Sequence, residues 1–377
     1  MLAANKTRQA SNFLATRQAI INRVKSAGVG GAGDFHPLKL GLGLTDRCNS
    51  RCAYCSASVG PDGKELMSPE IMAKALVGAR ESGIPAVVLT GGEPTTRFET
   101  LLGAAALAIR AAWLLAIQTN TKMPELTAVR LFDRLWQNGW GSRTENVLQF
   151  NLSYALSRSE EEARGLINFV RLFGESGLNG QIVIEALHDQ PIPAEEGIEI
   201  MNHRLGDRLT GLGYLFQTGE KRLRVLNNFP LMVGRAKVLR EMPLGAIIRE
   251  NSPLLELDSY RRVEQIAEDT IAVDPLGFVY PAGLYMYLGL YPIGDLVENT
   301  LPRIIADANF DPVLIMISRG MAGDLYRLAA NLYPEFGRLT ATCADPFEVI
   351  ADILEEPDKA LAIMDKAADY LKITARE

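Results

Sequence analysis

Residues 38–55 read Leu-Lys-Leu-Gly-Leu-Gly-Leu-Thr-Asp-Arg-Cys-Asn-Ser-Arg-Cys-Ala-Tyr-Cys, and residues 85–94 read Pro-Ala-Val-Val-Leu-Thr-Gly-Gly-Glu-Pro. Each stretch opens with a short apolar run that is typical of a β-strand. The first run leads into three cysteines, and the second leads into two glycines, an acidic residue and a proline. Functional residues of parallel β/α units gather where the strands end. We therefore expect the thiols and the glycine turn at one edge of a sheet.

The three cysteines, Cys48, Cys52 and Cys55, are spaced closely enough to hold three corners of a cubane iron–sulfur cluster. Thiolate is the soft ligand that such clusters select. One iron of the cubane is then left open to a small molecule, as one position is left open on catalytic zinc. The alternative is a structural zinc site with His36 as fourth ligand, which would make the chain a non-catalytic, zinc-stabilised binding protein.

The two motifs together, in this order and at this spacing, resemble the radical S-adenosylmethionine (SAM) superfamily over about residues 38–240. The matching residues are Cys48, Cys52, Tyr54 and Cys55 in the first stretch and Gly91, Gly92, Glu93 and Pro94 in the second. The resemblance implies that the cysteines bind a [4Fe-4S] cluster and that SAM chelates the open iron through its amino and carboxylate groups. It also implies that the glycine turn and Glu93 receive the SAM amino group.

The reaction implied by the resemblance starts with one electron from a donor such as flavodoxin or ferredoxin. The electron cleaves SAM to methionine and a 5′-deoxyadenosyl radical, which abstracts a hydrogen atom from a substrate. The residue types suit this chemistry on physical grounds. Adjacent glycines let the backbone approach a ligand closely, and Glu93 offers hydrogen-bond acceptors to an ammonium group.

Strand-like and helix-like segments alternate along the chain, which predicts parallel β/α units. The fold class is therefore α/β, a partial (β/α)6 TIM-like barrel with a small C-terminal α+β extension of a hairpin and helices. We expect an N-terminal helical extension over 1–37 with one helix over 12–26, the barrel over 38–240 and a C-terminal domain with a helical tail over 241–377. Ser68 and Pro69 predict the start of a helix in the barrel, with serine as N-cap and proline at the first position. The predicted strands lie near 38–45, 85–90, 113–119, 147–153, 181–187 and 212–217.

Further candidate cofactor residues stand at the ends of the later strands. Asn120 follows strand three, where relatives often have a Thr-Asn-Gly turn, although Thr121 replaces the glycine. It either faces SAM or caps the next helix. Ser153 ends strand four, where relatives place a serine near SAM. Glu185, on strand five, is expected to point into the barrel toward SAM or substrate, because an unpaired carboxylate in the core would be costly.

Two more residues are considered by resemblance. Gly234, in Gly-Arg-Ala, resembles a turn near the adenine in relatives with a SPASM or twitch domain. Arg164 resembles an arginine that some relatives use for the SAM carboxylate, but a solvated helix face is the favoured interpretation of this residue.

The C-terminal half resembles a SPASM-like scaffold without its auxiliary cluster. Residues 273–281 read as a hairpin with an Asp-Pro-x-Gly turn. Ala282 stands where relatives place a cluster ligand, and Cys343 is the only cysteine of this half. Cys343 is either a small buried residue or a hydrogen donor, as in family members that epimerise peptide residues. Rearrangement or dehydrogenation of a small metabolite is the alternative to a peptide or natural-product substrate.

Composition fits a globular enzyme. The 377 residues are 47% hydrophobic and 22% charged, and the net charge of −6 argues against a general nucleic-acid binder. The sequence shows neither a membrane-spanning segment nor a signal pattern. Four cysteines, three of them assigned to a cluster, indicate a reducing compartment. We therefore expect a cytoplasmic protein.

Overall fold

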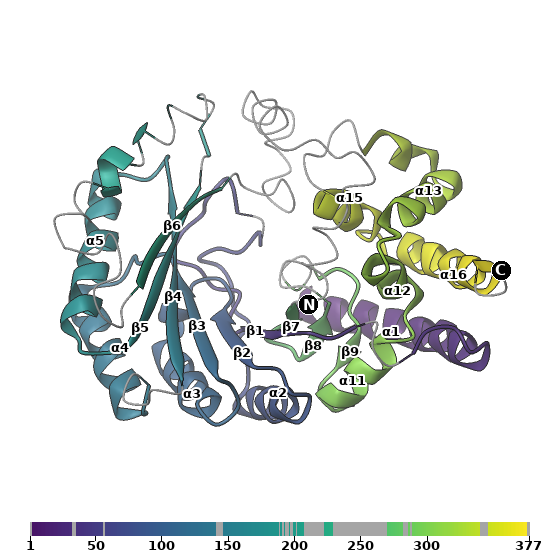
Figure 1. Ribbon diagram of the computed structural model, residues 1–377, viewed down its shortest axis with the longest axis horizontal. Coiled ribbons are helices and arrows are strands. Elements are labelled where there is room, and N and C mark those ends of the chain that lie inside the picture. Colours follow the sequence, from purple (N-terminus) through teal and green to yellow (C-terminus); the bar gives the residue numbers. More distant parts are fainter. Residues whose placement is uncertain are drawn as a thin grey trace.

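The computed structural model shows a curved sheet with helices along its outer side and a layer of helices at one end (Figure 1). The described residues are 2–31, 35–55, 57–140, 146–187, 189–190, 192, 196, 199–200, 202–206, 222–228, 270–281, 286, 289–339 and 346–374. Within these residues, no helix is long and apolar enough to cross a membrane.

One sheet of nine strands, in the order β6-β5-β4-β3-β2-β1-β7-β8-β9, runs through the described part of the chain. Strands β1 to β6 are parallel to their neighbours in sequence order, which is the arrangement of an open, partial TIM-like barrel. Their bounds are β1 Lys39–Gly43, β2 Ala86–Thr90, β3 Leu114–Thr119, β4 Val147–Ala155, β5 Gly180–Leu187 and β6 Arg222–Asn228. The first five lie where the sequence predicts them.

The sixth strand requires a correction. Residues 212–217 lie outside the described part of the chain, and the strand that pairs in parallel with β5 is β6, ten residues further on. Strand β6 carries two arginines in its first three positions, Arg222 and Arg224. The apolar run that precedes it was therefore the stronger strand signal in the sequence. The predicted domain boundary near residue 240 also lies outside the described residues and stays a prediction.

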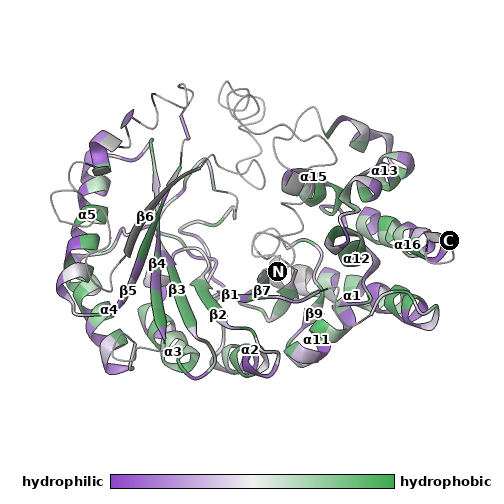
Figure 2. Cartoon of the chain, viewed as in Figure 1, coloured by the Kyte–Doolittle hydropathy of each residue, from purple (hydrophilic) through white to green (hydrophobic). Residues whose placement is uncertain are grey.

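The helices on the outer side of the parallel strands are α2 Pro69–Glu81, α3 Phe98–Ala108, α4 Glu125–Gln137 and α5 Glu160–Glu175. Helix α2 begins as predicted, with the Ser68 side chain accepting from the Ile71 amide and proline at the first position. Hydrophobic colour runs along β2 and β3, whereas the helices carry both hydrophobic and hydrophilic residues (Figure 2). Each helix therefore buries one side against the sheet.

Strand β4 shows how the two faces of the sheet differ. Its side chains alternate between half-buried and buried, and the buried ones include Phe150, Leu152 and Tyr154. The ring of Phe150 makes edge-to-face contacts with Phe169 and Phe173 of α5. The buried face therefore packs against the helices. The half-buried face, which carries Gln149, Asn151 and Ser153, points into the hollow of the curved sheet; this face is called the lumen below.

The predicted hairpin is confirmed and continues the same sheet. Strand β7, Thr270–Val273, pairs in parallel with β1, and β8, Phe278–Tyr280, turns back against β7. Asp274 accepts from the Leu276 and Phe278 amides, and Gly277 adopts a φ of 97° in the turn. Strand β9, Gly294–Asp295, then completes the sheet.

The N-terminal segment packs against the C-terminal helices. Helix α1, Leu2–Ser26, starts earlier than the predicted 12–26 and lies beside α16, Pro357–Thr374. Arg17 of α1 forms a buried ion pair of 2.7 Å with Asp311, which caps α12, Pro312–Ser318. The layer is completed by α11 Leu301–Ala308, α13 Ala322–Leu332 and α15 Pro346–Ile353. The predicted tail helix is thus part of the core of its own chain.

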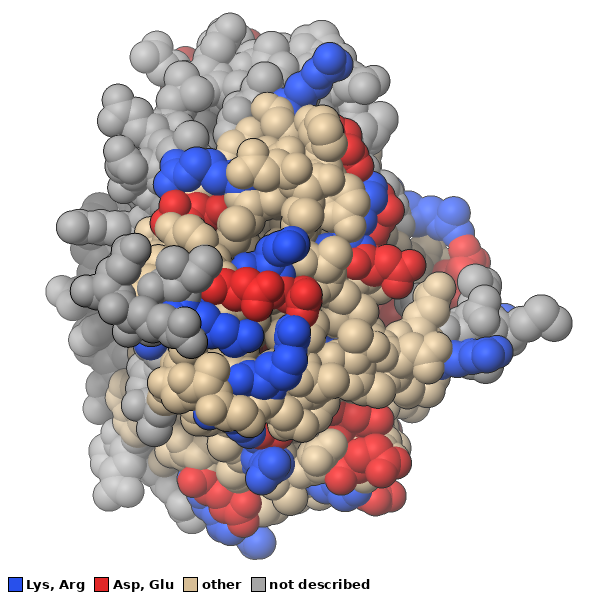
Figure 3. Space-filling view, turned by 90° about the vertical axis from the view of Figure 1, so that its right-hand side faces the viewer, with Lys and Arg blue, Asp and Glu red and all other residues tan. Residues whose placement is uncertain are grey.

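Charged residues of both signs are interspersed over the described part of the face shown in Figure 3. No large area of that face is occupied by basic residues alone.

Candidate active site

The loops after β1 and β2 are joined directly by backbone hydrogen bonds. The Gly92 amide donates to the Thr45 carbonyl oxygen at 2.6 Å, and the Glu93 amide donates to the Arg47 carbonyl oxygen at 2.8 Å. The cysteine loop therefore lies against the glycine turn, as the sequence predicts for two strands that end at one sheet edge.

The glycine pair is required by this close crossing. A Cβ atom on Gly91 would lie 2.4 Å from the Thr45 oxygen, and one on Gly92 would lie 2.1 Å from the Arg47 oxygen. Gly91 also adopts a φ of 132°, which side chains rarely allow. Both positions therefore need glycine for the packing of the protein itself, before any ligand is considered.

Glu93 is turned into the protein. Its side chain is buried, and its carboxylate accepts hydrogen bonds from four donors. Burial raises the pKa of Glu93, and the hydrogen bonds to its carboxylate oppose that rise. The donors are the Asn120 amide at 2.7 Å, the Thr119 hydroxyl at 2.8 Å, the Thr95 hydroxyl at 2.7 Å and the Thr95 amide at 3.2 Å.

This arrangement changes the role expected of Glu93. The carboxylate was expected to receive the SAM amino group, but its oxygens already accept from donors on the β2 and β3 loops. The side chain caps the short helix Pro94–Arg97 and holds the loop after β3 in place. The predicted roles of the Gly91–Pro94 turn and of Glu93 toward the SAM amino group stay predictions.

Asn120 connects the loop after β3 to the cysteine loop. Its side-chain amide donates to Asn49 Oδ1 at 2.7 Å and lies 3.9 Å from Cys48 Sγ, within the range of a hydrogen bond to sulfur. The next residue, Thr121, adopts a φ of 60°. This is the left-handed conformation that favours glycine, at the position where relatives have glycine. The side-chain amide of Asn120 is thus directed toward the cysteine loop, and its predicted role facing SAM stays a prediction.

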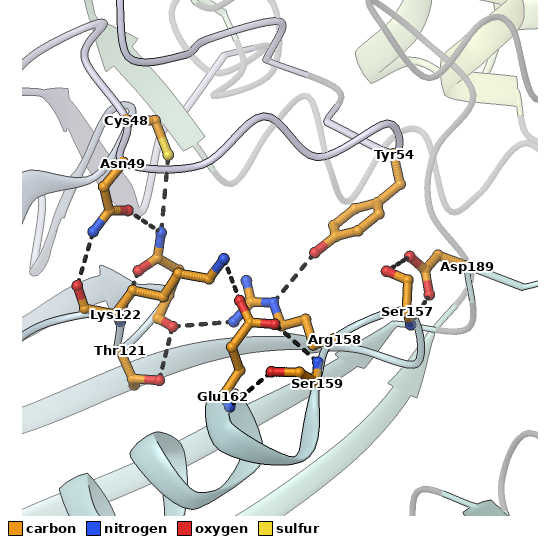
Figure 4. A network of polar contacts seen from close by, with 11 residues as sticks. Cys48, Asn49, Tyr54, Thr121, Lys122, Ser157, Arg158, Ser159, Glu162 and Asp189 are labelled. Atoms are coloured by element: carbon orange, nitrogen blue, oxygen red, sulfur yellow. Dashed lines mark hydrogen bonds and ion pairs between the residues drawn. The ribbon is translucent and has the colours of Figure 1, made fainter.

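Arg158, which the sequence hypotheses missed, lies at the centre of the polar network in Figure 4. It is 7% exposed, and its guanidinium donates to the Asn120 carbonyl oxygen at 3.0 Å and to the Tyr54 hydroxyl at 3.4 Å. It forms no ion pair with any described carboxylate. Arg164, the arginine considered from the sequence, is exposed on α5. The sequence feature that could have drawn attention to Arg158 was its position directly before Ser159, the N-cap of α5.

The cysteines themselves suit an iron–sulfur cluster. Cys48, Cys52 and Cys55 lie on one loop and are not joined by disulfides, and burial raises the pKa of Cys48 to about 11. The charges of Glu93 and of the other two thiols add to this rise in the pKa. Among described residues, no three His, Cys, Asp or Glu side chains converge on a single metal position. Cubane ligands bind separate irons, so three neighbouring thiols fit that group.

His36 does not fit the zinc alternative in which it is the fourth ligand. It is exposed and precedes the amino end of β1, whereas the cysteines follow the carboxyl end. A five-residue strand spans about 17 Å, so β1 holds the two groups apart. The hypothesis of a Cys3His zinc site with His36 is therefore wrong.

Ser153 and Glu185 lie side by side on neighbouring strands. They are register partners of β4 and β5, on the half-buried face that points into the lumen. Tyr154 is fully buried on the opposite face. The expectation that Glu185 points into the barrel agrees with this position. Gly234, Ala282 and Cys343 lie outside the described residues, so their predicted roles stay predictions.

A cavity of about 680 Å³ lies on another side of the cysteine loop, against the β7–β8 turn and helices α1 and α16. Its wall includes several carboxylates, among them Glu65 and Asp274. Burial, with a further contribution from Glu65, raises the pKa of Asp274 to about 7. None of Cys48, Cys52, Cys55 and the Gly91–Pro94 turn lines this cavity.

Residues 42–153, which contain both motif loops and the strands β2 and β3, match the family model described as Radical SAM superfamily. The chain contains a radical SAM domain. Enzymes of this superfamily use a [4Fe-4S] cluster and SAM and take electrons from a reductant.

Curated relatives match the radical SAM domain over short segments. A GTP 3′,8-cyclase of Syntrophomonas wolfei is 46% identical over 59 residues, which are 15% of this chain and 18% of the relative. The molybdenum cofactor biosynthesis protein 1 of Drosophila melanogaster is 42% identical over 66 residues, 16% of this chain and 12% of the relative. The chain thus spans less than a fifth of each relative's length.

A solved structure of BtrN in complex with AdoMet and 2-DOIA covers 76% of this chain and 89% of its own, with a TM-score of 0.43 and 14% identity. A second, anSMEcpe with bound AdoMet, covers 73% of this chain and 84% of its own, with a TM-score of 0.42 and 15% identity. At this level of similarity, neither structure indicates a substrate for this chain.

Proposed function

We propose that the carboxyl ends of β1 to β4 bind a [4Fe-4S] cluster through Cys48, Cys52 and Cys55, with SAM beside it. When bound and reduced, the two cofactors supply a radical that abstracts a hydrogen atom, here from a peptide or natural-product substrate. Flavodoxin or ferredoxin would serve as the reductant. The remaining protein groups hold the cysteine loop, orient the cofactors and exclude water.

The observation that carries the proposal is the direct joining of the three motif loops. The Gly92 and Glu93 amides of the glycine turn donate to carbonyl oxygens of the cysteine loop, and the Glu93 carboxylate then holds the loop after β3. That second loop places the Asn120 amide 3.9 Å from Cys48 Sγ. An amide donor near a cluster ligand is one of the groups that tune a cluster. Asn120 thus serves the cluster in this proposal.

Arg158 is the group we propose for the SAM carboxylate. It is a nearly buried guanidinium with hydrogen bonds to a carbonyl and a phenol but no ion pair with a described carboxylate. A buried cation without an anionic partner is costly, and guanidinium binds carboxylate through paired hydrogen bonds. Ser153 and the backbone of Gly91–Pro94 complete the proposed SAM-binding edge, and Gly234 is proposed for the adenine by resemblance.

Cys343 distinguishes the two reactions that could follow hydrogen abstraction. If the reaction is epimerisation, Cys343 returns a hydrogen atom to the substrate radical, and the variant C343A still cleaves SAM but does not complete turnover. If the reaction is rearrangement or dehydrogenation of a small metabolite, C343A remains productive. The GTP cyclisation named for relatives is not transferred to this chain, because their match is confined to the motif region.

Metal analysis tests the ligand assignment. After anaerobic reconstitution with iron and sulfide, we expect the wild type to hold about four irons per chain and to show the spectrum of a [4Fe-4S] cluster. Separate alanine variants of Cys48, Cys52 and Cys55 should lose this cluster. C343A is the matched control and should retain it. Stoichiometric zinc in the wild type, or cluster retention in all three variants, would overturn the proposal.

A further inference from the structure

Glu185 lies in the same layer of the sheet as the motif loops. It pairs in register with Ser153, and Leu152, the residue before Ser153, pairs with Thr119, the residue before Asn120. Adjacent strands are about 4.8 Å apart, so Glu185 is two strands, or on the order of 10 Å, beyond Asn120. Its side chain is thus near the motif loops but outside the group of residues proposed to hold the cluster.

Glu185 is also the single charged residue within β2 to β5. It is partly buried, and it makes no hydrogen bond or ion pair with any residue that the structure describes. Burial raises its pKa, with no compensating contact. Glu93, the other carboxylate at this edge, accepts from four donors. A carboxylate that loses hydration without a protein partner is unfavourable, so Glu185 is poorly explained as a structural group.

The described side chains of the lumen floor next to Glu185 are polar and uncharged, whereas the neighbouring strand β6 brings Arg222 and Arg224 into register with Gln181 and Val183. Gln181 Nε2 donates to Gln149 Oε1, and Gln149 Nε2 donates to Asn151 Oδ1. On the neighbouring strands the Thr90 hydroxyl donates to Gln118 Oε1 at 2.8 Å. These amides and hydroxyls form a hydrogen-bonding surface of the kind that binds hydroxyl or amide groups. Together with a carboxylate that contacts no described group, they favour a polar substrate with a positively charged group near Glu185.

We propose that Glu185 binds a protonated primary amine of the substrate, while the neighbouring amides and Ser153 bind its neutral polar groups. The substrate class is therefore a small, hydroxyl- or amide-bearing amine. This inference rests on the proposed function, because it names the substrate class of the same site. It assigns Glu185 a role in binding the substrate and not the cofactor. An ammonium group would provide the charge-assisted hydrogen bond that Glu185 otherwise lacks.

The test uses the reconstituted holoenzyme with saturating SAM. It compares pairs of probes in which one compound carries an amino group where the other carries a hydroxyl group. The pairs are glucosamine with glucose, and ethanolamine with ethylene glycol, titrated by anaerobic calorimetry. We expect the wild type to bind the amine of at least one pair tenfold or more tightly than its partner. We expect E185Q to lose this preference while it binds SAM as the wild type does. The exposed-site variant E175Q is the matched control and should keep the preference.

Three results would overturn the inference: no amine preference in the wild type for either pair, a preference that persists in E185Q, or loss of SAM binding in E185Q, which would assign Glu185 to the cofactor. The wild-type comparison holds even if E185Q misfolds. Failure of the proposed function is seen separately, as absence of a cluster or of SAM binding in the wild type before any probe is added.

Discussion

The carboxyl ends of β1 to β3 and those of β4 and β5 use their polar groups in different ways. In the first region, backbone amides, Glu93 and Asn120 are committed to hydrogen bonds that join three loops. In the second region, Glu185 faces the lumen without a partner among the described residues. The comparison teaches that the first region is built to hold a fixed geometry, whereas the second contains one carboxylate that contacts no described group. Substitutions should therefore affect folding and cluster binding in the first region, and substrate binding in the second.

The largest expected effect is at Gly92, where the loops cross most closely. In G92A the new Cβ would lie 2.1 Å from the Arg47 oxygen, so the backbone of one loop must move. We expect a loss of at least about 3 kcal/mol in the free energy of unfolding and loss of the cluster, measured by thermal unfolding and iron content. The matched control is G103A in α3, where a Cβ meets open space. It should be stabilising by about 0.5–1 kcal/mol. Wild-type iron content in G92A would contradict this account of the first region.

Glu93 comes next in expected effect. In E93Q one oxygen is replaced by an amide that donates, although all four protein groups around the carboxylate are donors. We expect a destabilisation of about 2–4 kcal/mol, because at least one buried donor loses its acceptor, and a lower cluster content. E99Q, on the exposed surface of α3, should change stability by less than about 0.5 kcal/mol. Equal melting temperatures for E93Q and E99Q would show that the Glu93 network does not hold the loops.

Arg158 stands at the border between the two regions. If its guanidinium binds the SAM carboxylate, R158M should raise the KM for SAM tenfold or more while the iron content stays close to wild type. A role confined to supporting the Asn120 carbonyl would instead reduce cluster content and kcat without a specific rise in KM. R164M changes an exposed arginine and should leave both parameters unaltered. The ratio of the effects on KM and kcat is the measurement that separates these roles.

The smallest effect is expected at Thr121, which holds a left-handed backbone conformation. A β-branched residue with positive φ is strained by about 1–3 kcal/mol. Glycine adopts a positive φ without strain, but it increases the conformational entropy of the unfolded chain, which lowers stability. T121G should therefore be more stable by up to about 1 kcal/mol, despite loss of the bond from the Thr121 hydroxyl to the Asn120 carbonyl. T121A loses that bond but keeps the strain, and should be less stable than the wild type. A T121G variant less stable than T121A would show that the turn is not strained.

The sequence predicted the motif-bearing half of the fold well, because local patterns determine it. Strands β1 to β5 and the β7–β8 hairpin are short apolar runs that end in glycine, proline or polar turns. The role of Glu93 was not predictable, because its four donors come partly from the β3 loop, 26 residues further along the chain. Arg158 was missed for a related reason: its significance lies in burial and in contacts to Tyr54 and Asn120, which no local pattern encodes.

The layer at the other end of the molecule was still less accessible to sequence analysis. The first turns of α1 are polar and show no apolar periodicity, so its start was placed too late. The buried pair of Arg17 and Asp311 joins residues 294 positions apart, and neither residue has a motif around it. Tertiary packing, not helix pattern, decides the position of α1 and α16.

The most direct test of the central claim is formation of 5′-deoxyadenosine by the reconstituted protein. The wild type and C52A would be incubated anaerobically with SAM and dithionite, with and without the amine probes, and the products separated by chromatography. The account predicts 5′-deoxyadenosine from the wild type and none above background from C52A. A fully loaded wild-type protein that forms no more 5′-deoxyadenosine than C52A, with every probe, would contradict the assignment of the joined motif loops as a radical-generating site.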